Sequence, residues 1–457
     1  MTVSNERIVR WLTVAVLGGV ALLGAMLPAA AADQVWTVVP TPGLGPNTRI
    51  ESVACVGGSW CVSVGSSEPA GAGVRSLIAM GDGATWSVST DDDPSVPNLL
   101  NGVSCASRTS CFAVGNDLQP PVPWTSTNRI QRWDGASWSV VPSPQIAFTP
   151  EGIAGQALQA ISCSSASWCA AVGYYGSYPI AISPSFLVWD GTTWAITADP
   201  LVVGSTERPY GISCTSATFC VAVGYGQTGG RTTGLLWRWD GSTWTRDAMP
   251  DVGLPDSYLR SVSCLAPTWC SAVGIRADGS VPGRTLNVVW DGTAWSVVPT
   301  PNLDDQYNYL KGISCATTTS CTAVGDHFGR IGGDGSFGYE NLIMFWDGAE
   351  WSVVPNPPTV GPTAGPERAS LCAGATCPSD TPRNFAERSW FGGVTGAKDP
   401  DPVRASAGVW ANRLYGVSCF STSACRATGT AEDGSTPQGF VLAWDGAFAD
   451  PVPRFTG

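Results

Sequence analysis

The chain has a single histidine, His327, and is poor in basic residues, with 24 Lys and Arg against 36 Asp and Glu. One histidine excludes copper and zinc sites that need several His ligands, and a Ser-His-Asp triad would have to use His327 itself. No nucleophile elbow, P-loop or dinucleotide fingerprint occurs in the sequence. We therefore expect His327 to be a loop histidine within residues 325–329. The net charge of −12 disfavours a nucleic-acid partner, because an acidic surface repels phosphate backbones.

Long apolar runs are also missing, except at the N-terminus. Arg7 and Arg10 precede an apolar stretch over residues 11–27, and three alanines at 30–32 offer a cleavage site. This pattern predicts a secretory signal peptide over residues 1–32 and a mature chain over residues 33–457. We expect a secreted, extracellular protein, free or associated with the cell wall. An uncleaved membrane anchor is the alternative, because the stretch is almost long enough to span a bilayer.

Cysteine, by contrast, is plentiful, and its 16 residues form pairs along the chain. Structural zinc sites use short Cys knuckles together with His, so a chain with one His points to disulfides and to no metal site. An exported chain also meets oxidising conditions. The expected local bridges are Cys55–Cys61, Cys105–Cys111, Cys163–Cys169, Cys214–Cys220, Cys264–Cys270, Cys315–Cys321, Cys372–Cys377 and Cys419–Cys425.

Seven of these pairs have C-x5-C spacing and belong to a repeat. Each is followed by Ala-Val-Gly or a variant, then by Asp-Gly-x-x-Trp or a variant, and most copies lie 50 or 51 residues apart. In the copy from Leu259 to Pro299 we expect strands at residues 259–264, 270–274, 286–290 and 295–299, with a tight turn at Asp291-Gly292. Four antiparallel strands per copy predict an all-β fold, a β-propeller of four-stranded blades.

The ends of the repeat predict how the ring closes. Residues 35–42 match the pattern of the fourth strand of a repeat, but no hairpin precedes them. The last copy, in contrast, ends after its third strand, at Trp444. We expect the N-terminal strand to complete the last blade, which removes exposed sheet edges. The final step of 104 residues equals two repeats, but residues 356–409 lack the repeat pattern. We interpret them as a long loop insertion in a seven-bladed propeller; eight blades with one degenerate blade is the alternative.

Tryptophan recurs at two positions of the repeat, before Asp-Gly and at the start of the fourth strand. Recurrence in every copy favours packing between neighbouring blades over a row of sugar-stacking residues. The turn Gly191-Thr-Thr-Trp194 resembles the Asp-box of sialidase-like propellers. It differs in that the Asp here directly precedes the Gly, whereas in the Asp-box it lies two residues before the Gly. Trp-Asp-Gly-x-x-Trp is similar to an element of kelch repeats without the Gly-Gly doublet. Over residues 35–446 the chain most resembles secreted bacterial propeller proteins built of Cys-Ala-Val-Gly and Trp-Asp-Gly repeats, which implies an extracellular propeller and carries over no catalytic residue.

Acidic residues gather where we expect loops between blades: residues 91–93, Asp304, Asp305, Glu207 and Asp256. Paired carboxylates serve glycoside hydrolysis or hold Ca²⁺, but acid runs in loops are more often solvated surface. We expect no cofactor, and Ca²⁺ is the alternative that these acids leave open.

Function is expected on the face where the connections vary in length, opposite the Cys hairpins and Asp-Gly turns. Our leading hypothesis is a non-catalytic, monomeric binding propeller that recognises an extracellular glycan or protein there, with no membrane contact once the signal peptide is cleaved. The alternatives are a carbohydrate-active enzyme, a glycosidase or lyase using the loop carboxylates, and a purely structural surface protein. Expected ligand contacts are Tyr174, Tyr175, Tyr210, Tyr258, Tyr307, Tyr309 and Trp390.

Overall fold

A computed structural model describes most of the chain between Val35 and Gly446. All of its regular elements are strands, as the repeat predicts. No helix of the described part is long and apolar enough to cross a membrane. The signal peptide, the insertion at 356–409 apart from Asn356, and the Cys372–Cys377 pair fall outside it. The described residues are 35–41, 44, 47–58, 60–69, 73–82, 85–90, 96–118, 126–146, 155–177, 181–197, 206–228, 230–278, 283–303, 307–331, 336–356, 411–432 and 437–446.

The described strands fall into seven antiparallel groups of four, which we number as blades 1 to 7. Blades 1 to 4 are β2 (Thr48–Val56), β3 (Trp60–Ser67), β4 (Arg75–Gly81), β5 (Trp86–Thr90); β6 (Asn98–Ser107), β7 (Ser110–Leu118), β8 (Ser126–Trp133), β9 (Trp138–Val141); β10 (Gly155–Ser165), β11 (Trp168–Ser177), β12 (Ala181–Trp189), β13 (Trp194–Ile196); and β14 (Thr206–Ser216), β15 (Phe219–Thr228), β16 (Arg231–Trp239), β17 (Trp244–Asp247). Blades 5 to 7 are β18 (Asp256–Ala266), β19 (Trp269–Ala277), β20 (Arg284–Trp290), β21 (Trp295–Val298); β22 (Asn308–Thr317), β23 (Ser320–Ile331), β24 (Ser336–Trp346), β25 (Trp351–Val354); and β26 (Ala411–Ser421), β27 (Ala424–Glu432), β28 (Pro437–Trp444) with β1 (Thr37–Val39).

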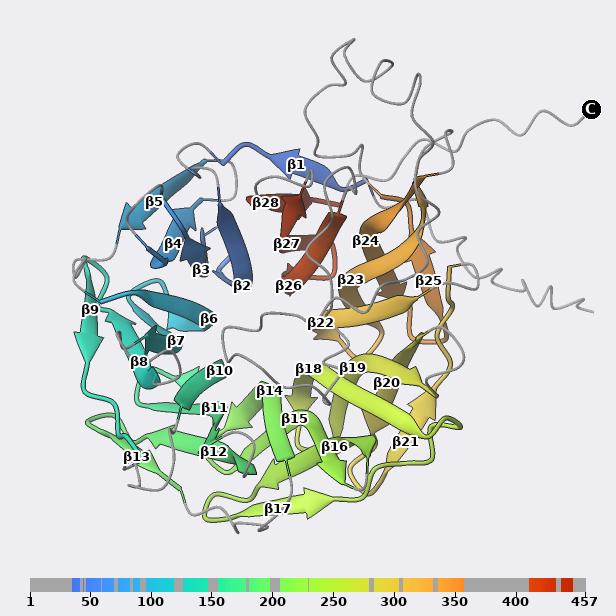
Figure 1. The fold of residues 1–457 in the computed structure, drawn as a ribbon, viewed down its shortest axis with the longest axis horizontal. Helices are drawn as coiled ribbons and strands as arrows, with labels where there is room; N and C mark the ends of the chain where they lie inside the picture. Colours follow the sequence, from blue (N-terminus) through green and yellow to red (C-terminus); the bar gives the residue numbers. More distant parts are fainter. Residues whose placement is uncertain are drawn as a thin grey trace, which may run out of the picture.

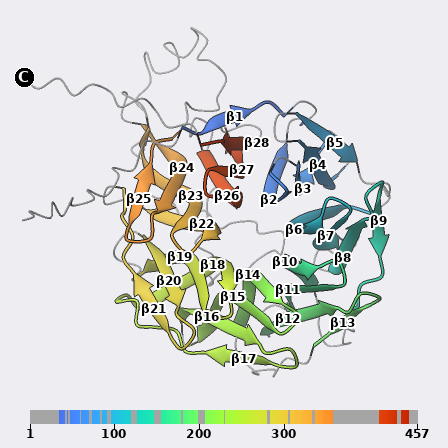
Figure 2. The same ribbon diagram turned by 180° about the vertical axis from the view of Figure 1, so that it is seen from behind.

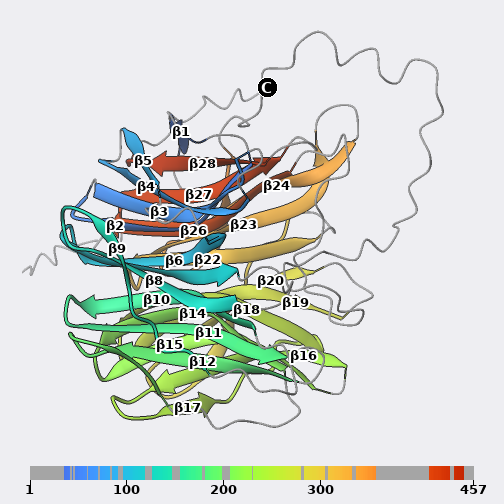
Figure 3. The same cartoon turned by 60° about the vertical axis from the view of Figure 1, so that its left-hand side comes forward.

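The blades stand around a common axis, which confirms the propeller (Figure 1). The first strand of each blade lies nearest the axis, and the fourth lies at the rim, as the view from behind also shows (Figure 2). Seen obliquely, successive blades follow one another around the ring with their strands running through its thickness (Figure 3). We call β2, β6, β10, β14, β18, β22 and β26 the inner strands.

The ring closes through the N-terminal strand, as expected. β1 pairs with β28 in antiparallel register, with Thr37 opposite Ala443 and Val39 opposite Val441. Trp36 is 1% exposed and joins Trp444 in one apolar cluster. The first strand of the chain therefore completes the blade formed by its last three.

Each inner strand carries a β-bulge, which simple alternation does not predict. In β18 the register jumps from Leu259, opposite Gly274, to Ser261, opposite Val273. Arg260 is the extra residue, so the buried Leu259 and Val262 lie three positions apart. The other inner strands have the same shift four residues before their first Cys, at Glu51, Asn101, Gln159, Tyr210, Lys311 and Tyr415.

The bulge explains the glycine of Ala-Val-Gly. A Cβ added at Gly274 would lie 1.8 Å from the carbonyl oxygen of Tyr258 in the paired inner strand. The corresponding glycine of every other blade meets its inner strand in the same way, at 1.9 to 2.1 Å. A side chain at this position would separate the first two strands, so the repeat keeps glycine opposite the bulge.

The core lies between blades and not within them. Val221 and Leu236 of blade 4 pack with Leu259 and Trp295 of blade 5 in one cluster. The Trp residues that open the fourth strand are buried in six of the seven blades, from Trp36 at 1% to Trp295 at 7% exposure. The expectation that the repeated Trp residues pack between blades is confirmed for these six.

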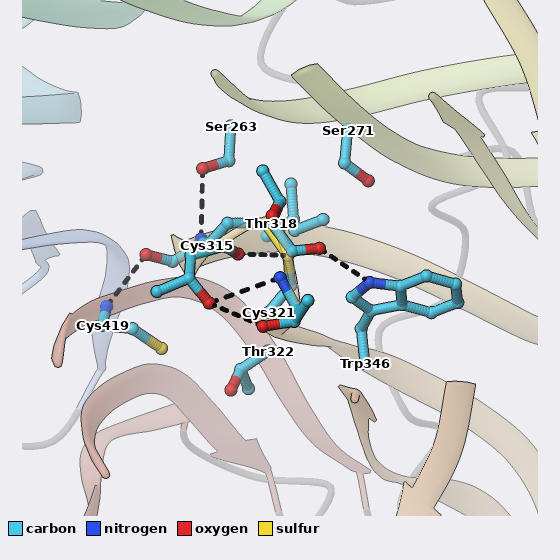
Figure 4. The surroundings of a disulfide bond; sticks show 12 residues. Ser263, Ser271, Cys315, Thr318, Cys321, Thr322, Trp346 and Cys419 are labelled. Carbon is cyan, nitrogen blue, oxygen red and sulfur yellow. Dashed lines mark hydrogen bonds between the residues drawn. A yellow bond between two sulfur atoms is a disulfide. The ribbon is translucent and has the colours of Figure 1, made fainter. Parts of the chain in front are cut away.

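Seven disulfides bridge directly opposed residues of the first two strands in each blade, as predicted. The second Cys of each pair is buried, at 0 to 1% exposure. The backbone NH of the first Cys reaches the neighbouring blade: Cys315 N donates to Ser263 Oγ at 3.1 Å, and Cys419 N donates to Ser314 Oγ at 2.9 Å (Figure 4). Blades 6 and 7 are therefore direct neighbours, although 104 residues separate their first cysteines.

This serine link recurs at six of the seven blade interfaces. One of these six interfaces joins blade 7 to blade 1 and closes the ring; there Cys55 N donates to Ser418 Oγ at 3.1 Å. Blade 1 has Ala54 at the position of these serines, so the interface with blade 2 lacks the link. We expect Ala54→Ser to supply it and to raise the free energy of unfolding by about 1 kcal/mol, the usual net value of one hydrogen bond.

Urea unfolding of the mature protein measures that change, and Ser263→Ala is the matched opposite. Ser263→Ala removes the hydrogen bond that Cys315 N donates to Ser263 Oγ, and it should lower the free energy of unfolding by a similar amount. A decrease of stability in Ala54→Ser would show that the first interface is too tight for a hydroxyl group.

The Asp-Gly turns lie at the opposite end of the blades from the variable loops and have a purely local role. Asp190 Oδ1 accepts hydrogen bonds from the backbone NH groups of Thr192 and Thr193, both at 2.8 Å. Gly191 takes a φ of +99°, as the turn prediction requires. Hydrogen bonds from the Thr192 hydroxyl and from these NH groups lower the pKa of Asp190 to about 2. Similar bonds lower the pKa of Asp134, Asp240, Asp291 and Asp347.

These lowered pKa values predict an acid-sensitive contribution to stability. A carboxylate whose folded pKa lies below its unfolded value of 3.8 stabilises the fold above that pH and loses the effect as pH falls toward 2. In Asp→Asn variants at 134, 190, 240 and 291, the amide oxygen still accepts in the turn but no longer titrates. We expect the melting temperature of the quadruple variant to fall less than that of the wild type between pH 4 and pH 2. Parallel pH curves for the two proteins would contradict this.

Candidate functional site

Five of the expected contact tyrosines gather around the inner strands of blades 4 to 6. Tyr210, Tyr258 and Tyr309 lie on β14, β18 and β22, Tyr174 lies on β11 of blade 3, and Tyr307 directly precedes β22. Tyr174, Tyr210 and Tyr307 are half-buried, whereas Tyr258 is 8% and Tyr309 0% exposed. Tyr258 and Tyr309 are thus core residues that show no ring face to solvent. Trp390 lies outside the described residues.

Cationic side chains join these tyrosines into one row across five blades. Tyr174 and Tyr210 have ring centroids 6.4 Å apart, and the Arg260 guanidinium lies 4.1 Å from the Tyr210 ring. On its other side Arg260 lies 5.6 Å from the Tyr309 ring, and its Nε donates to the Tyr309 hydroxyl. Lys311 Nζ lies 5.6 Å from Tyr309.

The row ends at Tyr415 of blade 7, whose ring lies 4.6 Å from the Nζ atom of Lys311 in blade 6. We call the six residues of the row the inner belt: Tyr174, Tyr210, Arg260, Tyr309, Lys311 and Tyr415. Cation–π contacts of this kind are worth about 0.5–2 kcal/mol each, depending on burial. The inner belt therefore holds its own side chains in fixed positions.

Two further tyrosines, Tyr225 and Tyr258, pack against the inner belt. Tyr225 stacks on Tyr210 with centroids 5.5 Å apart, and Tyr258 meets the edge of Tyr225 at 4.8 Å. Tyr225 and Tyr258 belong to one buried cluster with Tyr309 and Ile275. Tyr210 thus has one face packed on the core while part of its surface stays exposed.

Lys311 is the most buried cation of the belt. It is 7% exposed, and its Nζ lies 2.8 Å from Asp326 Oδ1 on β23. A buried charge needs such a partner, because desolvation would otherwise favour its neutral form. Lys311 therefore has a positioning role toward Tyr309 and Tyr415, with its charge balanced inside the blade.

The inner belt shares four of its residues with the bulges. We call the seven bulge residues the bulge ring: Glu51, Asn101, Gln159, Tyr210, Arg260, Lys311 and Tyr415. Six of them are half-buried, and Lys311 is buried. The residue just before each bulge is apolar, with 0% exposure in six blades; in blade 4 it is Pro209, which is also buried. Each blade therefore presents one polar or aromatic side chain on its strand nearest the axis.

Of this ring only Tyr210 was among the expected ligand contacts, and the other six residues were not predicted. The signal was available in the repeat. Five residues before the first Cys every copy has Ile, Leu or Pro, and two residues before it every copy has Val or Ile. The position between, four before the Cys, holds Glu, Asn, Gln, Tyr, Arg, Lys and Tyr in turn. No aliphatic residue occurs there.

Two of the expected loop acids are described, and both lie in strands, contrary to our expectation. Glu207 in β14 is 5% exposed and pairs with Arg246 of the same blade. Asp256 begins β18, and its carboxylate accepts a hydrogen bond from Thr232 N at 2.8 Å. Both carboxylates therefore have structural partners. The acids at 91–93, 304 and 305 lie outside the described residues.

His327 was expected in a loop but lies inside β23, 7% exposed and 3.9 Å from Glu340. The strand continues through the predicted loop because β23 and β24 remain paired as far as Ile331 and Ser336. Within the part of the chain that is described, no three His, Cys, Asp or Glu side chains gather closely enough to hold a metal ion.

No protein-family model and no curated protein matches the chain. Several solved structures are similar to it in shape. YCF48 bound to D1 peptide has 12% identity over 92% of this chain and 99% of that one, with a TM-score of 0.48. SapL1 lectin in complex with alpha methyl fucoside has 14% identity over 78% and 98%, with a TM-score of 0.40. Trypanosoma rangeli sialidase has 10% identity over 66% and 54%, with a TM-score of 0.40. We report these as similarities and draw no argument from them.

Proposed function

We propose that this protein is a secreted, non-catalytic binding propeller that recognises an extracellular glycan or protein through the inner belt and the variable loops beside it. The observation that carries the proposal is the continuous row from Tyr174 to Tyr415, in which aromatic rings and cations hold one another in place. Preorganised aromatic and Arg side chains are the usual anchors of binding sites, because little entropy is lost when a ligand binds them.

The position of the belt supports the same function. Each inner strand runs from a variable connection between blades to the constant Cys hairpin, and the bulge lies in its first half. The belt therefore faces the end of the ring where loops differ in length from blade to blade. Binding residues are commonly carried on such a rigid scaffold beside variable loops.

The disulfides support export, because seven local bridges suit an oxidising compartment. Glu207 and Asp256 already have structural partners, Arg246 and the Thr232 amide, which favours binding over catalysis by these two carboxylates.

The test is binding of the mature chain, residues 33–457, to a glycan array and to isolated bacterial cell walls. We expect saturable binding that Arg260→Ala weakens about tenfold or more, as loss of a central anchor does. Arg108→Ala is the matched control, because Arg108 is exposed on a Cys hairpin at the opposite end of the ring. Melting curves confirm that both variants are folded.

A glycosidase and lyase screen with and without Ca²⁺ runs beside the binding assays. Turnover of any glycan by the wild type would replace the binding proposal by the enzymatic alternative. Absence of binding to arrays, cell walls and peptides alike would leave a purely structural surface protein.

A further inference from the structure

The bulge ring differs from the repeated features of the inner strands in its composition. The apolar residue before the bulge, the serine before the first Cys and the first Cys itself recur in most or all blades, and they are buried or half-buried. A ligand site repeated at each blade interface would need the same accessible side chains in every blade. At the bulge, instead, the residue changes from blade to blade, and only Tyr occurs twice.

The bulges explain how side chains from seven different blades can contribute to a single site. An extra residue in one strand turns its side chain away from the regular faces of the sheet. The inner strands surround the axis (Figure 1), and the bulge occupies the equivalent register position in each of them, so one bulge residue from every blade lies around that axis. The contacts between blades agree: Asn101 Nδ2 of blade 2 donates to Leu158 O of blade 3 at 2.8 Å, and Arg260 of blade 5 touches Tyr210 of blade 4.

The ring has two chemically different arcs. Blades 1 to 3 contribute Glu51, whose carboxylate accepts hydrogen bonds, and Asn101 and Gln159, whose amides both donate and accept. Gln159 makes no side-chain hydrogen bond to another described residue. Blades 4 to 7 contribute two aromatic rings, Tyr210 and Tyr415, held by Arg260 and Lys311.

This composition favours a sugar over a protein ligand. All seven side chains can donate or accept hydrogen bonds, and the ring contains no aliphatic residue, Met, Trp or Phe. The fully buried core of a protein interface combines such Tyr and Arg anchors with apolar side chains, which the ring lacks. A pyranose or furanose ring instead needs hydroxyl partners on its rim and an aromatic face for its C–H groups, and Tyr supplies such a face together with a polar tip.

Resting on the proposed function, we infer that the bulge ring is a single asymmetric glycan site on the propeller axis, which binds one saccharide segment per chain. A sugar ring packs against the exposed part of Tyr210, whose ring faces already contact Tyr225 and Arg260, and its hydroxyl groups bond to the amide arc at Asn101 and Gln159. Lys311 and Tyr309 act as positioning residues, because both are buried and hold Arg260 and Tyr415 in place.

Titration calorimetry tests the inference with soluble hexasaccharides of glucose, mannose, galactose, arabinose and N-acetylglucosamine, and with an acidic and a basic decapeptide as protein probes. We expect one saccharide bound per chain. Tyr210→Ala should weaken the dissociation constant about tenfold, whereas Tyr210→Phe, which keeps the ring, should change it by less than about threefold. Gln159→Ala should weaken it about threefold to tenfold, the effect of one or two hydrogen bonds.

Gln438→Ala is the matched control for Gln159, because Gln438 is exposed on β28, two strands farther from the axis. It should leave the affinity unchanged. Several equivalent saccharides per chain, or saccharide binding that is insensitive to Tyr210→Ala and Gln159→Ala, would overturn the single axial site while leaving the binding function intact. Binding of a decapeptide without any hexasaccharide would overturn the glycan class. Failure of every probe, cell walls included, would remove the proposed function itself.

Discussion

Deleting residues 33–42 should lower the melting temperature of the mature protein by 10 °C or more and cause it to aggregate. The deletion removes β1 and leaves the edge of β28 unpaired, and exposed edges promote association between chains. It also removes Trp36, which is 1% exposed and packs 6.5 Å from Trp444. Loss of one buried Trp costs about 3–5 kcal/mol, a large part of the 5–15 kcal/mol that stabilises a typical domain.

A synthetic peptide of residues 33–42 provides the control for this experiment. If β1 acts by pairing with β28, the peptide should bind the truncated protein and restore its melting temperature as peptide concentration rises. A peptide with Trp36→Ala should restore it much less. Scanning calorimetry follows both series. An unchanged melting curve for the truncated protein would show that the ring does not depend on β1 for closure.

Much of this fold is predictable because each blade repeats the same local signals. The C-x5-C pairs, the Asp-Gly turns and the unpaired fourth strand at the N-terminus predict the hairpins, the blade and its closure, and the structure confirms all three. The bulges escaped prediction because a single extra residue leaves the apolar pattern almost unchanged. Two features of the repeat point to them: the three-residue spacing between the apolar positions before the first Cys, and the glycine of Ala-Val-Gly, which leaves room for the carbonyl of the paired inner strand.

The candidate site was predictable in part for a different reason. Tyrosines near the starts of the inner strands could be named from topology, but their burial could not. Tyr309 is fully buried because Arg260 approaches it from the neighbouring blade 5, while Lys311 of the same strand lies beside its ring. Contacts between residues about 50 positions apart depend on the angle between blades, and no local pattern encodes that angle. The position of His327 inside β23 likewise depends on how far β24 continues its pairing.

The largest loss of stability should follow reduction of the disulfides. Each bridge closes a loop between residues six positions apart, as in Cys264–Cys270, and contributes about 2 kcal/mol in the chain-entropy model. Seven such contributions, even if they add only in part, are comparable to the whole stability of a domain. The bridges also hold the amide of the first Cys toward the serine of the preceding blade, so their loss weakens the interfaces as well as the hairpins.

We therefore expect the fully reduced and alkylated chain to lose its near-ultraviolet circular dichroism at 37 °C, whereas the oxidised protein keeps it. With a reductant present, the buried second cysteines should become alkylated only after unfolding, because they are 0 to 1% exposed. Loss of one bridge is the graded control: Cys264→Ala with Cys270→Ala should lower the unfolding free energy by about 2 kcal/mol and leave the other blades folded. A reduced chain that melts like the oxidised one would show that packing between blades, with its buried Trp and Leu residues, holds the propeller together without the bridges.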